Sequence, residues 1–172
     1  MTSWIGAAIL AGLLLQEPPG ANSYLGKAPP ELVSQPDQWF NAPEATTLAK
    51  LRGKVVWLEF GFIKCLPCRK MKPVLTRWHE ELGPKGLVVI DVDDGAVDDF
   101  DEVKKEVESK GEKFATLYDK DARNSMAYGI QGHPQAWLIG VDGKVAWECI
   151  PDIKKVEDLQ KAIAEELKKV KK

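Results

Sequence analysis

The feature that most constrains this chain is Cys65-Leu66-Pro67-Cys68, which separates an apolar run from a segment with helical periodicity. The apolar run, residues 55–60, is typical of a strand that is buried on both faces. The segment after the cysteines carries one apolar stripe at helical spacing, formed by Met71, Leu75, Trp78 and Leu82. Two cysteines at this spacing, where a strand leads into a helix, can open and close a disulfide reversibly.

The position of the cysteine pair also indicates which sulfur reacts first. A helix N-terminus supplies partial positive charge and free N–H groups, and both favour a thiolate at Cys65. Cys68 lies one turn further on and could attack a mixed disulfide formed at Cys65. A structural zinc site would need further paired ligands, whereas Cys149, His79 and His133 stand alone in the sequence. We therefore expect thiol–disulfide exchange, with no metal and no other cofactor.

The N-terminus differs in kind from the rest of the chain. Residues 4–15 are all apolar and are followed by a Pro/Gly-rich gap. This run is shorter than the roughly 20 residues of a spanning helix and fits the apolar region of a secretory signal. We expect residues 1–17 to be a signal peptide or N-terminal anchor, residues 18–50 a linker and extended region, and residues 51–172 the folded domain. The net charge of −2 gives no reason to expect a nucleic-acid partner.

The order of elements predicts an α/β fold. A second buried strand at 87–92 makes a parallel strand–helix–strand unit with the first. We then expect a helix over 98–110, a strand over 114–118 and a short helix over 121–128. Strands at 136–141 and 144–150 flank Asp142-Gly143, a strong hairpin signal, and a last helix begins near residue 153.

These elements carry motifs that resemble the thioredoxin fold, namely Glu59-Phe60, the Cys65–Cys68 pair, Pro73 and Gly132-His133-Pro134. The chain is more similar to the exported TlpA/ResA-like branch, through Gly26-Lys27-Ala28-Pro29-Pro30, the entry Leu51-Arg52-Gly53-Lys54 and the long segment between Asp93 and Gly129. The likeness begins near residue 25 and implies a three-layer fold: a central mixed sheet flanked by helices, with the strand-and-helix insertion of this branch.

The resemblance also assigns roles to single residues. It implies that Cys65 is the nucleophile, that Cys68 resolves the mixed disulfide, and that Glu59 is a buried acid that takes the proton of Cys68. Pro134 corresponds to a cis-proline facing the disulfide, and Pro73 to a structural proline inside the helix. The remaining positions that shape the site are Lys64, Leu66, Pro67 and His133.

Lys64, Gly61 and Met71 depart from the family pattern, and Met71, which stands where some haem-maturation members carry an acid, argues against a dedicated role in cytochrome c maturation. Lys64 and Gly61 each replace an aromatic residue, and Lys64 is either a cation that stabilises the thiolate or a solvated loop residue. Cys149 follows Val145 and Trp147 in alternation and is interpreted as a small core residue.

The function implied is an exported, periplasmic or membrane-anchored reductase. Its partners would be exported proteins with cysteine pairs, such as apocytochromes c or copper-centre assembly proteins, and a membrane electron donor of the thioredoxin-reducing type. The alternatives are a disulfide oxidase or isomerase, and a copper carrier using Cys65, Cys68 and His133. A peroxidase is disfavoured because the Thr and Cys pattern of peroxiredoxins is absent.

Overall fold

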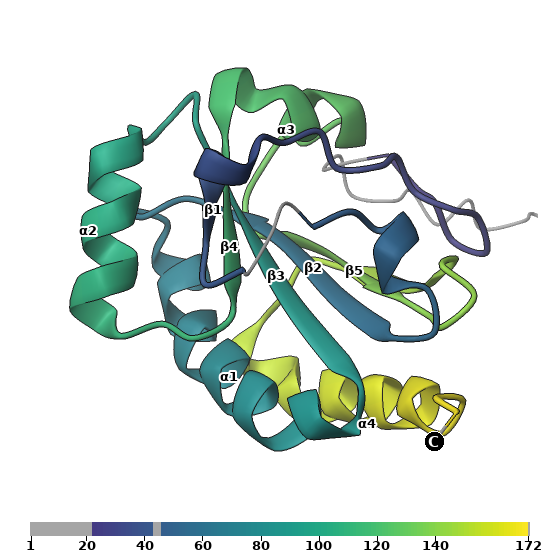
Figure 1. The fold of residues 1–172 in the computed structure, drawn as a ribbon. Coiled ribbons are helices and arrows are strands. Elements are labelled where there is room, and N and C mark those ends of the chain that lie inside the picture. The colour runs from purple at the N-terminus through teal and green to yellow at the C-terminus, as the bar shows by residue number, and fades with distance from the viewer. Residues whose placement is uncertain (1–21, 43–45, 172) are drawn as a thin grey trace, which may run out of the picture.

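The computed structural model describes residues 22–42 and 46–171, and its centre is a six-stranded mixed sheet. The sheet order is β1-β4-β3-β2-β5-β6 (Figure 1). The strands are β1 (Trp39–Phe40), β2 (Val55–Gly61), β3 (Leu87–Asp94), β4 (Ala115–Asp119), β5 (Gln135–Ile139) and β6 (Val145–Cys149). Strands β2, β3 and β4 are parallel, whereas β1, β5 and β6 run antiparallel to their neighbours.

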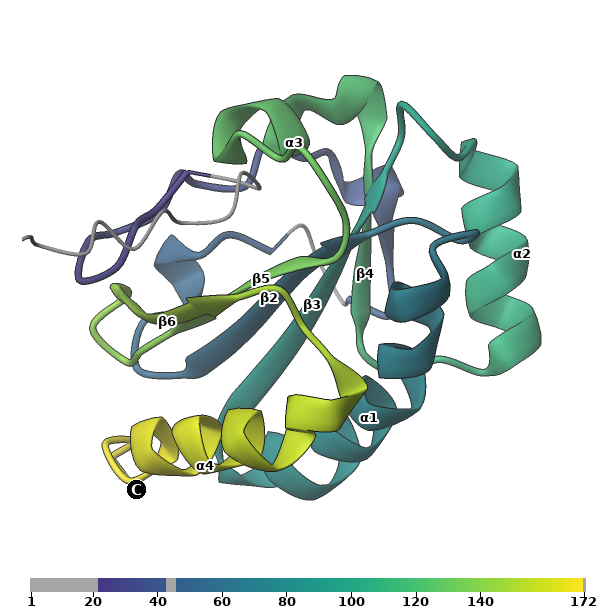
Figure 2. The same ribbon diagram turned by 180° about the vertical axis from the view of Figure 1, so that it is seen from behind.

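Helices cover both faces of this sheet and produce three layers. They are α1 (Leu66–Leu82), α2 (Phe100–Lys110), α3 (Arg123–Tyr128) and α4 (Val156–Leu167). Helices α1 and α4 lie across one face, with α2 beside α1, while α3 and the N-terminal segment lie on the other (Figures 1 and 2). The expected α/β thioredoxin-like architecture with a central mixed sheet is confirmed.

The two faces of the sheet carry two apolar cores, and β2 contributes to both. Its residues alternate in direction, so Trp57 packs against the α1 side while Leu58 and Phe60 pack against the other. All seven residues of β2 are buried, as the near-continuous apolar run predicts. The apolar stripe of α1 is fully buried, and Trp78 meets Trp57 edge-to-face at 5.1 Å between ring centroids.

Most strand boundaries differ from the sequence-based expectation by one or two residues, α3 begins at Arg123 and not at residue 121, and two further differences change the description of the fold. Helix α2 begins at Phe100, and Asp99 caps it by accepting a hydrogen bond from the Glu102 N–H, so Asp98 lies before the helix. Strand β1 lies in the region expected to be linker, where Trp39 is buried and pairs with Leu117 of β4. The expected signal or anchor segment, residues 1–17, lies outside the described residues.

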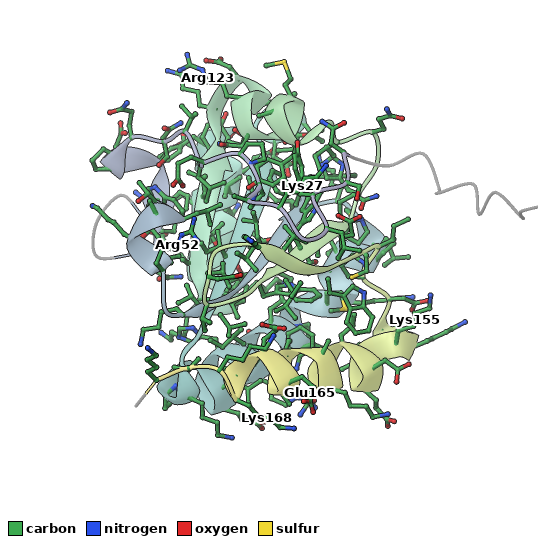
Figure 3. All side chains as sticks on the ribbon, turned by 90° about the vertical axis from the view of Figure 1, so that its right-hand side faces the viewer. Lys27, Arg52, Arg123, Lys155, Glu165 and Lys168 are labelled. Carbon is green, nitrogen blue, oxygen red and sulfur yellow. A yellow bond between two sulfur atoms is a disulfide. The ribbon has the colours of Figure 1, made fainter. Side chains whose placement is uncertain are left out.

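The outer side of α4 is charged. Glu165 projects from α4, Lys155 and Lys168 flank its two ends (Figure 3), and Lys168 Nζ lies 2.6 Å from Glu165 Oε1. Within residues 22–42 and 46–171, the helices are too short or too polar to cross a membrane.

Candidate active site

The cysteine pair forms a disulfide at the start of α1. Cys65 is the N-cap residue, and its Sγ accepts a hydrogen bond of 3.2 Å from the Cys68 N–H. Both cysteines are almost fully buried, at 4% and 3% exposure, whereas the intervening Leu66 and Pro67 and the preceding Lys64 are exposed. The helix therefore directs a backbone N–H and its positive end toward the sulfur of Cys65, as the sequence position predicts.

Glu59 is buried on β2, on the sheet face that carries α1. Its Oε2 accepts a hydrogen bond of 2.9 Å from Trp57 Nε1, and Asp91 lies directly opposite it on β3. Burial, reinforced by the charge of Asp91, raises the pKa of Glu59 to about 8, although the Trp57 bond and the charge of Lys72 act against this shift. Such a carboxyl group can hold or accept a proton near neutral pH.

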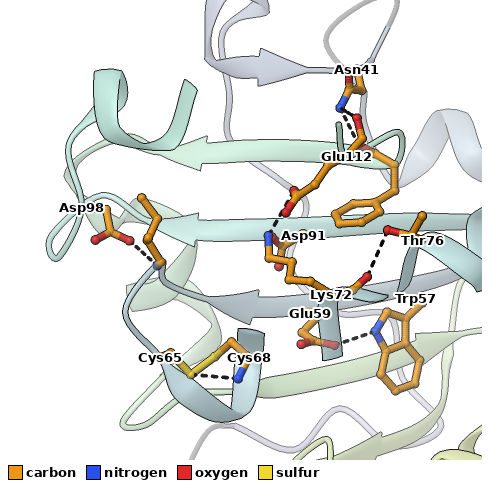
Figure 4. A network of polar contacts seen from close by, with 12 residues as sticks. Asn41, Trp57, Glu59, Cys65, Cys68, Lys72, Thr76, Asp91, Asp98 and Glu112 are labelled. Atoms are coloured by element: carbon orange, nitrogen blue, oxygen red, sulfur yellow. Dashed lines mark hydrogen bonds and ion pairs between the residues drawn. A yellow bond between two sulfur atoms is a disulfide. The ribbon is translucent and has the colours of Figure 1, made fainter. Parts of the chain in front are cut away.

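A buried ion network extends from this acid toward α2 (Figure 4). Lys72 of α1 makes an ion pair with Asp91, and its Nζ lies 3.3 Å from Glu112 Oε2 and 5.4 Å from the centre of the Phe114 ring. Burial lowers the pKa of Lys72, but Asp91 and Glu112 raise it by more, so the lysine stays charged. The sequence pattern did not indicate this network, because charged residues of an amphipathic helix ordinarily face solvent.

Gly61, at the end of β2, leaves the space between Asp91 and Cys68 open. A Cβ atom at Gly61 would lie 3.3 Å from Cys68 Sγ and 3.9 Å from Asp91 Oδ1. Because Gly61 has no side chain, Asp91 and Cys68 both lie close to this end of β2.

Replacing Gly61 by alanine tests this close approach. We expect Gly61→Ala to lower the free energy of unfolding of the oxidised protein by about 1–3 kcal/mol, the usual cost of an added methyl group in a packed core. Urea denaturation measures the change. Gly83→Ala is the matched control, because a Cβ there has nothing within 4 Å. Equal stability of Gly61→Ala and the parent would contradict the close packing.

His133 and Pro134 lie directly before β5. The peptide bond between them is cis, and Pro134 is buried. His133 Nε2 lies 3.3 Å from Asp94 Oδ2, and its ring meets Phe62 edge-to-face at 5.3 Å between centroids. Burial lowers the pKa of His133, and the nearby charges of Asp94 and Asp98 offset part of this effect. The Phe62 contact joins His133 to the segment that precedes Cys65.

Two other residues singled out from the sequence are Pro73 and Cys149. Pro73 stands inside α1, where its backbone cannot donate to the preceding turn. Cys149 packs at the edge of the core on the α1 side of the sheet, in the same cross-strand row as Ala136 and Glu59. Burial, with the charge of Glu59, raises the pKa of the Cys149 thiol to about 12. Among the described residues, no group of three or more His, Cys, Asp and Glu side chains could hold a metal ion.

The sequence matches a family model and several characterised relatives. The model of the AhpC/TSA family matches residues 26–148. The thiol-disulfide oxidoreductase ResA of Bacillus thuringiensis strain Al Hakam is 34% identical over 103 residues, which are 60% of this chain and 58% of that protein. ResA of Bacillus thuringiensis subsp. konkukian is 32% identical over 123 residues, covering 72% and 67% of the two chains. The chain thus spans less than two thirds of the length of the first of these relatives.

Solved structures show the same fold. A protein described as a thiol:disulfide interchange protein DsbE, from Chlorobium tepidum, superposes with a TM-score of 0.72 at 23% identity, covering 81% of this chain and 95% of that one. A protein described as a disulfide isomerase, from Bacteroides thetaiotaomicron, gives a TM-score of 0.73 at 24% identity, with 87% and 93% covered.

Proposed function

Because the chain belongs to the AhpC/TSA family, we propose that it is a thiol–disulfide oxidoreductase that reduces disulfides of other proteins through Cys65 and Cys68. The observation that carries this proposal is the disulfide at the N-terminus of α1, with a buried acid of raised pKa on the adjacent strand. The ResA relatives, which are named for this activity, support it.

The reaction proceeds in two exchanges. In the reduced enzyme the Cys65 thiolate attacks a substrate disulfide, so one substrate sulfur leaves as a thiolate and a Cys65–substrate disulfide forms. Cys68 then loses its proton to Glu59 and attacks the Cys65 sulfur. The second substrate thiolate leaves and is protonated, and the enzyme ends with the Cys65–Cys68 disulfide. The substrate gains two electrons and the enzyme loses two.

Side chains around the cysteines serve this cycle. Helix α1 stabilises the Cys65 thiolate through its N-terminal N–H groups. Leu66 and Pro67 present an exposed surface between the sulfurs, where a substrate chain can lie. Lys64 adds a positive charge before Cys65, and His133 and Pro134 form the facing wall of the site.

The setting proposed is extracytoplasmic, with residues 1–17 as signal peptide or anchor. Substrates would then be cysteine pairs of exported proteins, such as apocytochromes c or copper-centre assembly proteins. A membrane electron donor of the thioredoxin-reducing type would return two electrons to the Cys65–Cys68 disulfide after each turnover.

The reduction potential of the Cys65–Cys68 pair tests the proposed direction. The protein with Cys149→Ser is equilibrated with glutathione buffers, and we expect a value at or below about −220 mV, the poise of a reductant. A value near −120 mV would identify an oxidase or isomerase and overturn the reductase proposal. A pair that does not cycle would overturn catalysis altogether. Stoichiometric Cu(I) retention that is lost in His133→Ala would then establish the copper-carrier alternative.

A further inference from the structure

The segment that leads into Cys65 makes a hydrogen bond to a distant carboxylate, that of Asp98. Residues 62–65 form a turn in which the Cys65 N–H donates to the Phe62 carbonyl at 3.1 Å. The Ile63 N–H points out of this turn and donates to Asp98 Oδ2 at 2.5 Å (Figure 4). Asp98 is only 3% exposed, and it lies just before α2. A backbone N–H that donates to a buried carboxylate oxygen loses its partner if that side chain is removed, so Asp98 holds the turn that carries the first cysteine.

The other end of the same short loop reaches His133. Asp94 closes a turn in which its Oδ1 accepts from the Ala96 N–H and its carbonyl accepts from the Val97 and Asp98 N–H groups. Its Oδ2 faces His133 Nε2 at 3.3 Å. The His133 side chain also contacts Phe62, so these contacts form a closed series. The series runs from the turn at 62–65 to Asp98, along the loop to Asp94, then to His133 and back to Phe62.

The path of this loop is tightly packed. A Cβ atom at Gly95 would lie 2.5 Å from the Asp119 carbonyl oxygen, so the backbone presses directly on the end of β4. Because this loop is tightly packed and is held at both Asp94 and Asp98, a shift of one of these residues displaces the other.

A neighbouring carboxyl group explains how Asp98 can remain buried. Asp93 Oδ1 and Asp98 Oδ1 are both buried and make no hydrogen bond in the described part of the chain. Burial, with the charges of Asp91 and Asp98, raises the pKa of Asp93 to about 9, so Asp93 carries a proton at neutral pH. A protonated Asp93 could donate to Asp98 through these two oxygens, while Asp98 Oδ2 accepts from Ile63.

We propose that residues 94–98 are a brace for the dithiol, in which Asp98 and Asp94 are positioning residues for the turn before Cys65 and for His133. The proposal rests on the thiol–disulfide exchange proposed above. These contacts are seen around the closed disulfide; the proposal is that they also hold Cys65 at the N-terminus of α1 after reduction, where its thiolate is stabilised, so that releasing them moves the equilibrium toward the disulfide. Neither aspartate contacts the reacting atoms.

The test compares three variants in the Cys149→Ser background, each equilibrated with glutathione. Asp98→Ala removes the acceptor of the Ile63 N–H, and we expect its dithiol–disulfide equilibrium to move about tenfold toward the disulfide, close to 30 mV. Asp98→Asn keeps an acceptor for Ile63 and gains a donor toward Asp93, so we expect it to stay within about threefold of the parent. We expect the alkylation rate of Cys65 near neutral pH to change in Asp98→Ala and to stay close to the parental rate in Asp98→Asn.

Asp99→Ala is the matched control for a purely structural effect. It removes the cap of α2 one residue away, so it should lower the melting temperature while leaving the dithiol equilibrium unchanged. If Asp98→Ala does not fold, Asp94→Ala, at the other end of the loop, gives the same test with the same expected direction. In the double variant Asp94→Ala/Asp98→Ala, the shift should be smaller than the sum of the single shifts, because both substitutions release one brace.

Three results would overturn the proposal: an unchanged equilibrium in Asp98→Ala, an equal shift in Asp98→Asn, or an equal shift in Asp99→Ala. An equal shift in Asp98→Asn would mean that the charge of Asp98 causes the change in the dithiol–disulfide equilibrium. An equal shift in Asp99→Ala would mean that a general loss of stability causes it. The parent is titrated beside the variants, so a failure of the brace is distinct from a failure of the proposed function. In the second case the parent itself would not cycle.

Discussion

A Cys65→Ser variant is expected to lose disulfide-reduction turnover by roughly 10³-fold or more, because the covalent nucleophile is removed. A Cys68→Ser variant should instead accumulate a mixed disulfide with the substrate, since Cys65 still attacks and no second thiol releases it. The reduction of a protein disulfide measures the first effect, and non-reducing electrophoresis with mass spectrometry measures the second.

The third cysteine supplies the control for both variants. Cys149 is half-buried in β6, apart from the pair, so Cys149→Ser is expected to keep the parental turnover and to trap no substrate. Turnover that survives in Cys65→Ser, or a mixed disulfide that forms through Cys149, would contradict the assignment of the two roles.

The Glu59→Gln variant is expected to be more stable than the parent at pH 8 and to lose part of the dependence of stability on pH. The carboxyl of Glu59 ionises near pH 4.5 in the unfolded chain, whereas in the folded protein it holds its proton up to a pKa of about 8. Between these values the unfolded state binds fewer protons, so the free energy of unfolding falls as pH rises. The slope approaches 1.4 kcal/mol per pH unit, or about 4–5 kcal/mol over the whole window.

Urea denaturation of the oxidised protein from pH 5 to pH 8 measures this effect. Asp93 also makes the free energy of unfolding fall as pH rises, because its pKa is raised to about 9. Glu59→Gln should therefore remove one part of this pH dependence, and Asp93→Asn the other. The amide at position 59 can still accept the Trp57 hydrogen bond. Glu80→Gln reports the effect of the same substitution at an exposed site on α1. If the slope is the same in the parent and in Glu59→Gln, the carboxyl is ionised throughout.

The sequence predicted the structure best where a spacing or a run of residues is typical of one kind of element. The Cys65–Cys68 spacing, the near-continuous apolar run of β2 and the stripe of α1 predicted the centre of the fold, and these elements are confirmed. Strand β1 was missed because two residues cannot display an alternating pattern.

The polar interior of the site was predicted only in part. Glu59 was recognisable because an acid inside an apolar strand is unusual, but Lys72 resembles any solvated lysine of an amphipathic helix until Asp91 and Glu112 are seen around it. Asp98 was expected to begin a helix, and only the tertiary fold brings it to the Ile63 N–H. Such contacts join residues far apart in the chain, and no local pattern records them.

The placement of Cys149 has a consequence for the fidelity of the redox cycle. A protein that handles disulfides risks internal scrambling, in which a spare thiolate attacks its own reactive pair. With a thiol pKa of about 12, Cys149 is a thiolate in only about one molecule in 10⁵ at pH 7, so it is a very slow attacker. The same burial protects it from stepwise oxidation, which also proceeds through the thiolate. The chain can therefore carry an odd cysteine while its disulfide chemistry remains confined to one pair.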